Sequence, residues 1–254
     1  MPKKRSAELV VIGNGLSLPQ STAALLENSA SLSEIDSGDQ YLPYYCFNVR
    51  LKDKSGEWLP KDVFFHTLRE DTKPEINCVL LFLHKTHRYR VFSEAEGSKT
   101  ICQSLNRIEG YNQEVDKIIK CAECPNIPAR RWQNGNPPTC KLCYNFVGID
   151  LDDAEPFIIT AKSTSATPAK RFLNKFFLRK LKGKDLPLFV FRAKLGLETP
   201  EGTYSVLSFE MAGTNPPSEI ERYAALCEEL RASSKVDFTY EQPEDVSADS
   251  DLPF

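Results

Sequence analysis

The sequence predicts a β-rich α+β fold: a small barrel or sandwich with a four-cysteine insertion, a few helices and a disordered acidic C-terminal tail. Short β-like runs lie on both sides of the insertion, and the last 22 residues carry six acids and one lysine without apolar periodicity. The 254 residues are 41% hydrophobic, which is enough to bury a substantial core. The expected parts are an N-terminal segment 1–40, a core 41–232 with the insertion at 118–147, and a tail 233–254.

The strands are expected where β-branched and aromatic residues cluster between turn-forming residues. Several of these runs are short and apolar, which is typical of half-buried or buried strands. The runs lie at 43–50, 62–66, 78–83, 88–92, 156–161, 187–195 and 203–209.

Two helices are expected in the second half of the chain. Thr167 can cap the first, which carries apolar residues at helical spacing and should stop near Gly183. The second is expected at 218–231, where Ser218 and Glu221 have the spacing of a capping box.

Two CxxC pairs predict a metal site in the insertion. Cys121 and Cys124 precede Cys140 and Cys143 by a 15-residue stretch rich in Pro, Gly and Asn, which is too short to bury a core of its own. Two such pairs supply four thiolates for a tetrahedral Zn²⁺ site, and four protein ligands leave no open position, so the zinc is expected to be structural. Two redox pairs are the alternative.

The remaining cysteines are scattered singly, and the chain shows no secretion signal. They are expected to be reduced and mostly in the core; they are Cys46, Cys78, Cys102 and Cys227.

The charge distribution favours a polyanionic partner. The net charge is −3, but residues 233–254 carry −5, so the rest of the chain carries +2. Residues 160–194 hold ten bases opposed only by Asp185. Such an unmixed run suits phosphate contacts, although a solvated helix face is the commoner fate of a charge run.

The candidate nucleic-acid contacts combine cations with aromatic rings, because bases stack on rings while cations track phosphates. They come from the basic-aromatic run 85–90, from the loop of the insertion and from the first helix. The expected contacts are Arg88, Tyr89, Arg90, Arg130, Arg131, Trp132, Lys162, Lys170, Arg171, Lys175, Arg179 and Lys180.

The C-terminal tip resembles a known family. The chain ends in the acidic and apolar residues Asp249-Ser-Asp-Leu-Pro-Phe254, similar to the tail of bacterial single-stranded DNA-binding proteins. The core departs from the ordinary bacterial family, whose OB-fold is shorter and has no four-cysteine element. It is more similar in plan to phage-type single-stranded DNA-binding proteins, in which a zinc element accompanies an OB-fold.

The resemblance implies an OB-like barrel that binds and protects single-stranded DNA, without sequence preference, in DNA replication, recombination and repair. It also implies a tail that recruits partner enzymes and competes with DNA for the basic surface. The partner-binding residues would be Asp249, Asp251, Leu252, Pro253 and Phe254.

Two other functions follow less directly from the sequence. A phage recombination accessory protein, such as a recombination directionality factor, would act mainly through protein–protein contacts. An enzyme is not expected, because the histidines form no HExxH motif and a nucleophile signature is absent. A metal-dependent nuclease site would have to use an acidic stretch that is more simply a solvated loop: Asp150, Asp152, Asp153 and Glu155.

The sequence contains no apolar run of the length that a membrane span needs, so a membrane partner is not expected. The expected location is the cytoplasm of a bacterial or phage-infected cell. A homo-oligomer is left open.

Overall fold

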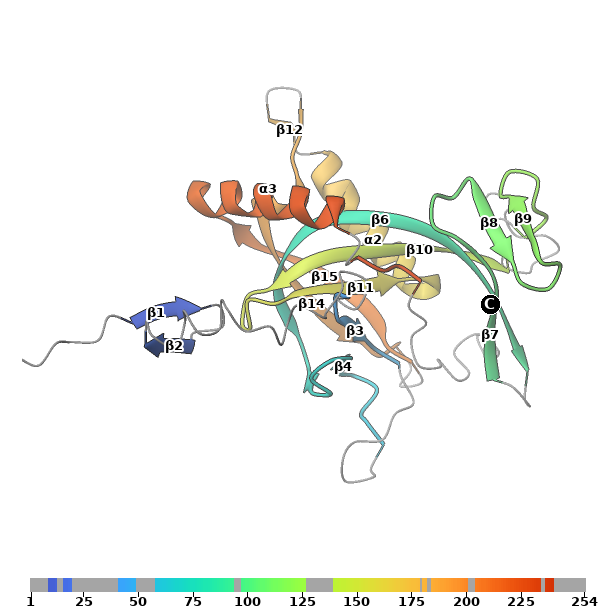
Figure 1. Ribbon diagram of the computed structural model, residues 1–254, viewed down its shortest axis with the longest axis horizontal. Coiled ribbons are helices and arrows are strands. Elements are labelled where there is room, and N and C mark those ends of the chain that lie inside the picture. Colours follow the sequence, from blue (N-terminus) through green and yellow to red (C-terminus); the bar gives the residue numbers. More distant parts are fainter. Residues whose placement is uncertain are drawn as a thin grey trace, which may run out of the picture. The chain divides into compact units, whose positions relative to one another are not determined.

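The computed structural model describes residues 9–12, 16–19, 41–48, 58–93, 97–126, 139–178, 180–181, 184–200, 204–233 and 236–239 (Figure 1). Contacts divide the chain into two units, Met1–Tyr41 and Leu42–Phe254. In the first unit, β1 (Leu9–Ile12) pairs antiparallel with β2 (Leu16–Pro19).

The second unit is strand-rich and contains the helices α2 (Ala166–Phe177) and α3 (Pro217–Ala232). Short 3-10 helices, η2 and η3, precede α2 and β14 at Ser163–Ser165 and Leu188–Val190. The strands are β3 (Tyr44–Cys46), β4 (Phe64–His66), β5 (Thr72–Lys73), β6 (Ile76–Ser93), β7 (Gly97–Ser104), β8 (Glu109–Asn112), β9 (Lys117–Lys120), β10 (Cys140–Asp150), β11 (Pro156–Ala161), β12 (Lys180–Leu181), β13 (Lys184–Asp185), β14 (Phe191–Glu198) and β15 (Val206–Thr214).

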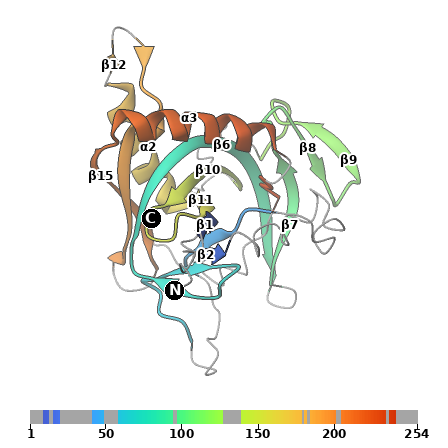
Figure 2. The same cartoon turned by 60° about the vertical axis from the view of Figure 1, so that its left-hand side comes forward.

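Most of these strands form one mixed, open sheet in the order β5-β4-β3-β11-β10-β6-β7-β8-β9. β3 and β11 are parallel, and the other pairs are antiparallel. β14 pairs with the first part of β6 and with β15, while β7 pairs with the last part of β6. The long strand β6 therefore forms an arch that joins two groups of strands (Figure 2).

The two faces of this sheet bury different side chains. The face that we call the α2 face carries Leu80, Phe146 and Ile159, which pack with Phe172 of α2 and Leu207 of β15. The opposite face, the α3 face, packs against α3, which runs over the outside of the β6 arch (Figure 2). Because strand side chains alternate between faces, a residue's position along β6 or β10 decides which helix it meets.

The α3 face has its own buried cluster. Val79, Val147 and Ile158 of the sheet pack there against Tyr223 and Cys227 of the helix. The predicted β-rich α+β class is therefore confirmed: strands dominate, and a helix covers part of each face of the central strands.

The expected strands are largely present, with two differences around them. The runs 78–83 and 88–92 belong to one continuous strand, β6. Residues 140–147, expected in the zinc insertion, belong to the regular strand β10 in the centre of the sheet. A CxxC spacing marks possible ligands but does not fix the backbone, and the apolar run 144–149 favours a buried strand.

The expected helices are present with different ends. The first ends at Phe177 and is followed by β12 and β13, which pair with each other. The second, expected at 218–231, begins at Pro217 without a side-chain cap, so the capping box does not form. Across the described part of the chain, neither helix is both long and apolar enough to cross a membrane.

Candidate functional site

Three cations from distant parts of the chain act on one place on the α2 face. Lys85 of β6 lies opposite Tyr144 of β10, and its Nζ is 5.1 Å from the centre of the tyrosine ring. Burial, together with the positive charges of Arg107 and Lys170, lowers the pKa of Lys85. We call Lys85, Arg107, Lys170 and Tyr144 the Tyr144 cluster.

The charges of the Tyr144 cluster repel one another. Among the described residues, the charged groups that shift the pKa of Lys85 are both positive. Arg107 also lowers the pKa of His87, where burial is the larger cause. Such a concentration of positive charge is stabilised when an anion lies among the cations.

A structured turn between β7 and β8 holds Arg107. The side-chain oxygen of Asn106 accepts hydrogen bonds from the backbone N–H groups of Ile108, at 2.8 Å, and Glu109, at 3.0 Å. Arg107 itself has a left-handed backbone with φ of 63°, a conformation that residues other than glycine rarely adopt. The turn therefore fixes the arginine in the chain at some conformational cost.

The amphipathic helix α2 holds Lys170. Phe172 and Phe176 are buried, and the Phe172 ring stacks on Phe209 at 5.1 Å between ring centres. Lys170 and the further bases Arg171 and Lys175 are exposed. Packing of the apolar side of the helix thus leaves its basic side toward solvent.

The structure separates the other expected nucleic-acid contacts. Arg88 is 8% exposed and donates a hydrogen bond to the backbone oxygen of Phe238. Tyr89 is the next residue along β6 and points to the opposite face. Arg90 follows it on β6, and Lys162 follows β11.

Several expected residues fall beyond what the structure describes. Arg130, Arg131, Trp132 and Arg179 lie outside the described residues, and so does the tip Asp249, Asp251, Leu252, Pro253 and Phe254. Lys180 belongs to β12. Of the expected contacts that are described, Lys170 is the one that joins the Tyr144 cluster.

The start of the tail crosses β6 and β7. The Phe238 ring stacks on His84 with 4.3 Å between ring centres. The Phe238 backbone oxygen also accepts a hydrogen bond from Gln103 at 2.8 Å, and Tyr44 donates one to the Asp237 oxygen. Arg88, which the sequence assigned to DNA, is thus bonded to the protein's own C-terminal segment.

A pocket next to the Tyr144 cluster gathers cysteines. It is lined by His87, Tyr89, Cys102, Ser104, Asn112, Ile119, Cys121, Cys124, Asn126 and Cys140. Three of the four expected zinc ligands are present, Cys143 is not among the lining residues, and Cys102 is. We call this cavity, with its four lining cysteines, the thiol pocket.

The four thiols of this pocket influence one another. Burial and the charges of Cys124, Cys102, Cys121 and, as the smallest cause, Cys143 raise the pKa of Cys140 to about 12. Burial and the charges of Cys124 and Cys121 raise the pKa of Cys102. All four are free cysteines, and four thiols are a donor set that fits Zn²⁺. As they stand, no three His, Cys, Asp or Glu side chains in the described ranges are arranged to hold a metal ion.

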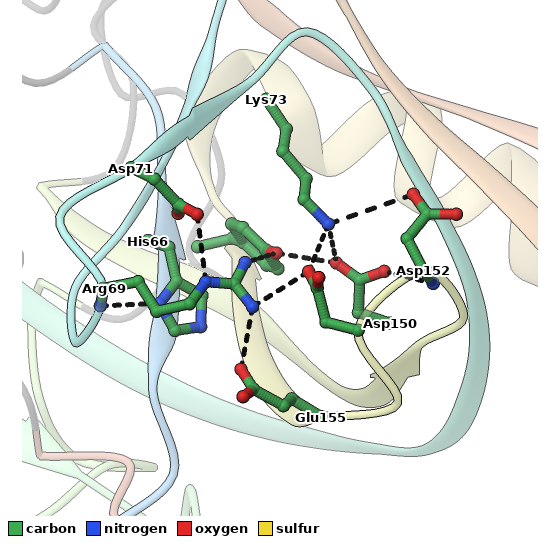
Figure 3. Close-up of polar contacts among 9 residues, drawn as sticks. His66, Arg69, Asp71, Lys73, Asp150, Asp152 and Glu155 are labelled. Carbon is green, nitrogen blue, oxygen red and sulfur yellow. Dashed lines mark hydrogen bonds and ion pairs between the residues drawn. The ribbon is translucent and has the colours of Figure 1, made fainter. Parts of the chain in front are cut away.

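The acidic stretch after β10 forms an ion-pair network rather than a solvated loop (Figure 3). Asp150 is 1% exposed and accepts hydrogen bonds from Lys73, at 2.8 Å, and from the Tyr45 hydroxyl, at 2.7 Å. Lys73 also pairs with Asp153 and, at 3.9 Å, with Asp152.

Arg69 completes this network. Its guanidinium lies 2.8 Å from both Asp153 and Glu155 and 3.0 Å from Asp71. Every acid that a nuclease site would use therefore lies beside Arg69 or Lys73. The network fastens β4 and β5 to the turn between β10 and β11.

Comparison with protein-family models, curated proteins and solved structures gives no match for this chain.

Proposed function

We propose that the protein binds single-stranded DNA without sequence preference and protects it during replication, recombination or repair. The observation that carries the proposal is the Tyr144 cluster. Lys85, Arg107 and Lys170 come from a strand, a turn and a helix, and the last two act on the first as repelling charges. A phosphate backbone among them relieves this repulsion and releases its own counterions.

Exposed apolar side chains beside these cations support contact with unpaired bases. Phe177 is 67% exposed and stands seven residues after Lys170, on the same side of α2. Ile108 follows Arg107 directly, and Tyr111 of β8 exposes half of its surface. Rings and apolar groups next to cations suit a single strand, whose bases are free to stack.

The strand order supports an OB-like plan for the core. β6, β10 and β11 form a meander, α2 connects β11 to β14, and β14 returns to the first part of β6 before pairing with β15. An OB-fold has five strands in this order, with a helix between the third and fourth. The plan departs from a closed barrel at β11. One edge of β11 pairs with β10, and its other edge pairs with β3.

This plan assigns the contact to one part of the core. OB-folds bind oligonucleotides through strands 2 and 3 and the loops between strands 1 and 2 and strands 4 and 5. Here the connection between the first two strands carries β7, β8, β9 and Arg107. α3 covers the α3 face of these strands, so we assign DNA to the Tyr144 cluster and this connection.

The test replaces the three cations together. Lys85→Gln, Arg107→Gln and Lys170→Gln should weaken oligo-dT binding and reduce the slope of log affinity against log salt by about 2, at about 0.7 per lost phosphate contact. The matched control removes three exposed bases that lie outside this connection: Lys61→Gln, Arg222→Gln and Arg231→Gln. Equal losses in both triple variants, with both folded by thermal melting, would contradict the assignment.

The recombination accessory protein is the second candidate, and exposed apolar residues favour it. Leu105, Ile108, Val115 and Ile118 are all exposed in and around β8 and β9. A protein partner could cover them, whereas scattered apolar residues are also normal on a surface. This candidate predicts no preference for single strands.

A further inference from the structure

The register of β10 separates the cysteines of the second CxxC pair. Cys140 pairs with Tyr89 and Cys143 with Thr86, and the register runs without a break as far as Val147. Residues three apart in a regular strand point to opposite faces. Cys140 therefore points to the α2 face, like Tyr144, and Cys143 to the α3 face, like Val147.

Cys143 is buried away from the thiol pocket. It is 1% exposed, and the charges that act on its thiol are those of Arg88, Lys162 and Arg90. To reach Cys140's side of the sheet, it would have to break the pairing of β10 with β6. Such a break would lose backbone hydrogen bonds between β10 and β6 in the centre of the sheet.

Cys102 lies with Cys140 on the α2 face, whereas Cys143 points to the α3 face. It pairs with Tyr89 from β7, and Cys140 pairs with the same Tyr89 from β10, so the two cysteines flank the tyrosine in one row. A register shift follows Tyr89 in the pairing with β7. Bulges of this kind re-aim neighbouring side chains.

The missing side chain of Gly110 makes room for the Cys102 sulfur. A Cβ at Gly110 would stand 3.0 Å from this sulfur and 2.8 Å from the backbone oxygen of Gln103. Gly110 pairs with Ile119 of β9, two residues before Cys121. The sulfur of Cys102 thus packs against the β8–β9 pair that leads into the first CxxC turn.

Backbone hydrogen bonds hold the first CxxC pair beside Cys140. The Cys124 N–H donates to the Cys121 oxygen at 3.2 Å, which closes the turn. The Cys140 N–H donates to the Asn126 oxygen at 2.9 Å. These bonds bring Cys121 and Cys124 to the row that Cys102 and Cys140 share.

We infer that Cys102, Cys121, Cys124 and Cys140 bind one Zn²⁺ ion, and that Cys143 is not a ligand. The cavity has a volume of about 20 Å³, roughly that of one water-sized sphere. The thiols have to turn about χ1 toward one another, and three staggered rotamers are available for this rotation. Zinc then replaces four thiol protons and draws the thiolates together.

The metal would tie the connection between β6 and β10 to the sheet. It links β7 through Cys102, the turn after β9 through Cys121 and Cys124, and β10 through Cys140. The site is structural because its four protein ligands close the coordination sphere. The inference of a zinc site does not depend on the proposed DNA binding, since a measurement of the metal content tests it by itself.

The experiment measures zinc per chain by plasma mass spectrometry in the full-length protein and in single variants. Wild type and Cys143→Ser should each hold one zinc, whereas Cys102→Ser and Cys121→Ser should hold much less. Loss of zinc in Cys143→Ser with retention in Cys102→Ser would overturn the proposal, and so would a zinc-free wild type with reduced thiols.

His87 provides a further control, because it lines the same pocket and its Nδ1 has no hydrogen-bond partner among the described residues. His87→Gln should keep its zinc. Loss of zinc in this variant would show that the His87 imidazole, and not one of the four thiolates, is the fourth ligand. If Cys102→Ser fails to fold, cobalt replaces zinc in Cys143→Ser. An unchanged thiolate-to-cobalt absorption relative to wild type supports the four ligands, and a loss of about one quarter contradicts them.

Discussion

At the scale of single residues, Lys73 and Asp150 join two parts of the sheet. The Lys73 ammonium is 2.8 Å from a carboxylate that is 1% exposed. Lys73→Met would leave the Asp150 carboxylate buried without a cationic partner, with hydrogen bonds from the Tyr45 hydroxyl and the Asp152 backbone N–H. We expect the free energy of unfolding to fall by about 3 kcal/mol.

Chemical denaturation of Lys73→Met and of a surface control measures this loss. Lys120→Met removes an ion pair with Glu123, at 3.7 Å, in which both side chains are 73% exposed. Exposed pairs contribute little to stability. Similar midpoints for both variants and wild type would show that the Lys73 pair does not stabilise the fold.

The same network gives the stability a defined pH dependence. The hydrogen bond from Lys73 lowers the pKa of Asp153 below its ordinary 3.8. The unfolded chain therefore takes up this proton first, and the contribution is full above about pH 4 and declines as the pH falls through the lowered pKa.

The base side of the profile has the opposite sign. Burial opposes the shift, but hydrogen bonds to Asp150 and Asp153 raise the pKa of Lys73 above 10.5. Its contribution is full below pH 10.5 and is lost as the pH rises through the raised pKa. Stability curves of Lys73→Met should be flatter than wild type in both ranges, and parallel curves would contradict this assignment.

Residue positions also show what spacing alone could not reveal. The CxxC pattern predicted that Cys121, Cys124 and Cys140 lie close together at one metal site, and these three do line one pocket. Cys102 was expected to be one of the scattered core cysteines, because it stands singly in the sequence and belongs to no CxxC pair. Strand alternation within 140–150 was the signal that could have separated Cys143 from Cys140.

At the scale of elements, α2 depends on its aromatic side for its position. Phe172 is 2% exposed and stacks on Phe209, while Phe177 on the same helix is 67% exposed. Phe172→Ala should lower the free energy of unfolding by about 3–5 kcal/mol, because it leaves a cavity in the core. Thermal and chemical denaturation measure the change.

Phe177→Ala is the matched control within the same helix. It should leave the stability close to that of wild type, since its ring is largely in solvent. If the ring contacts bases, this variant should nevertheless weaken oligo-dT binding. Equal destabilisation by both substitutions would mean that α2 does not pack as described.

Periodicity predicted the helices better than their ends. The apolar spacing found both helices, but the first ends at Phe177, and residues 180–181 and 184–185 pair as the strands β12 and β13. The continuity of β6 was not visible, because the polar residues 84–87 interrupt its apolar pattern. In the structure all four residues pair with β10, and His87 pairs with β7 as well, which explains why a strand tolerates them.

At the scale of the whole molecule, local patterns predicted the strand-rich class but not the strand order. The pairing of β14 with β6 joins segments more than a hundred residues apart, and no local pattern encodes it. The Tyr144 cluster depends on the same long-range order. Of its members, Lys170 was predicted as a contact, and Lys85 lay within a basic-aromatic run whose predicted contact Arg88 instead bonds to Phe238 on the α3 face.

The tail supplies a prediction at this scale. We expect deletion of residues 249–254 to abolish recruitment of partner enzymes, because the apolar and acidic tip would be the docking motif. DNA affinity should stay the same or rise, since negative charge is removed from a competitor of DNA. Pull-down from a lysate with and without the tip, beside oligo-dT titration, measures both; undiminished recruitment would exclude the tip as the docking motif.

The most direct test of DNA binding compares labelled oligo-dT with a duplex of the same length by fluorescence anisotropy, at two salt concentrations. The proposed function predicts a clear preference for the single strand and an affinity that falls as salt rises. Equal affinity for both, or no binding to either, would contradict it and favour the recombination accessory protein.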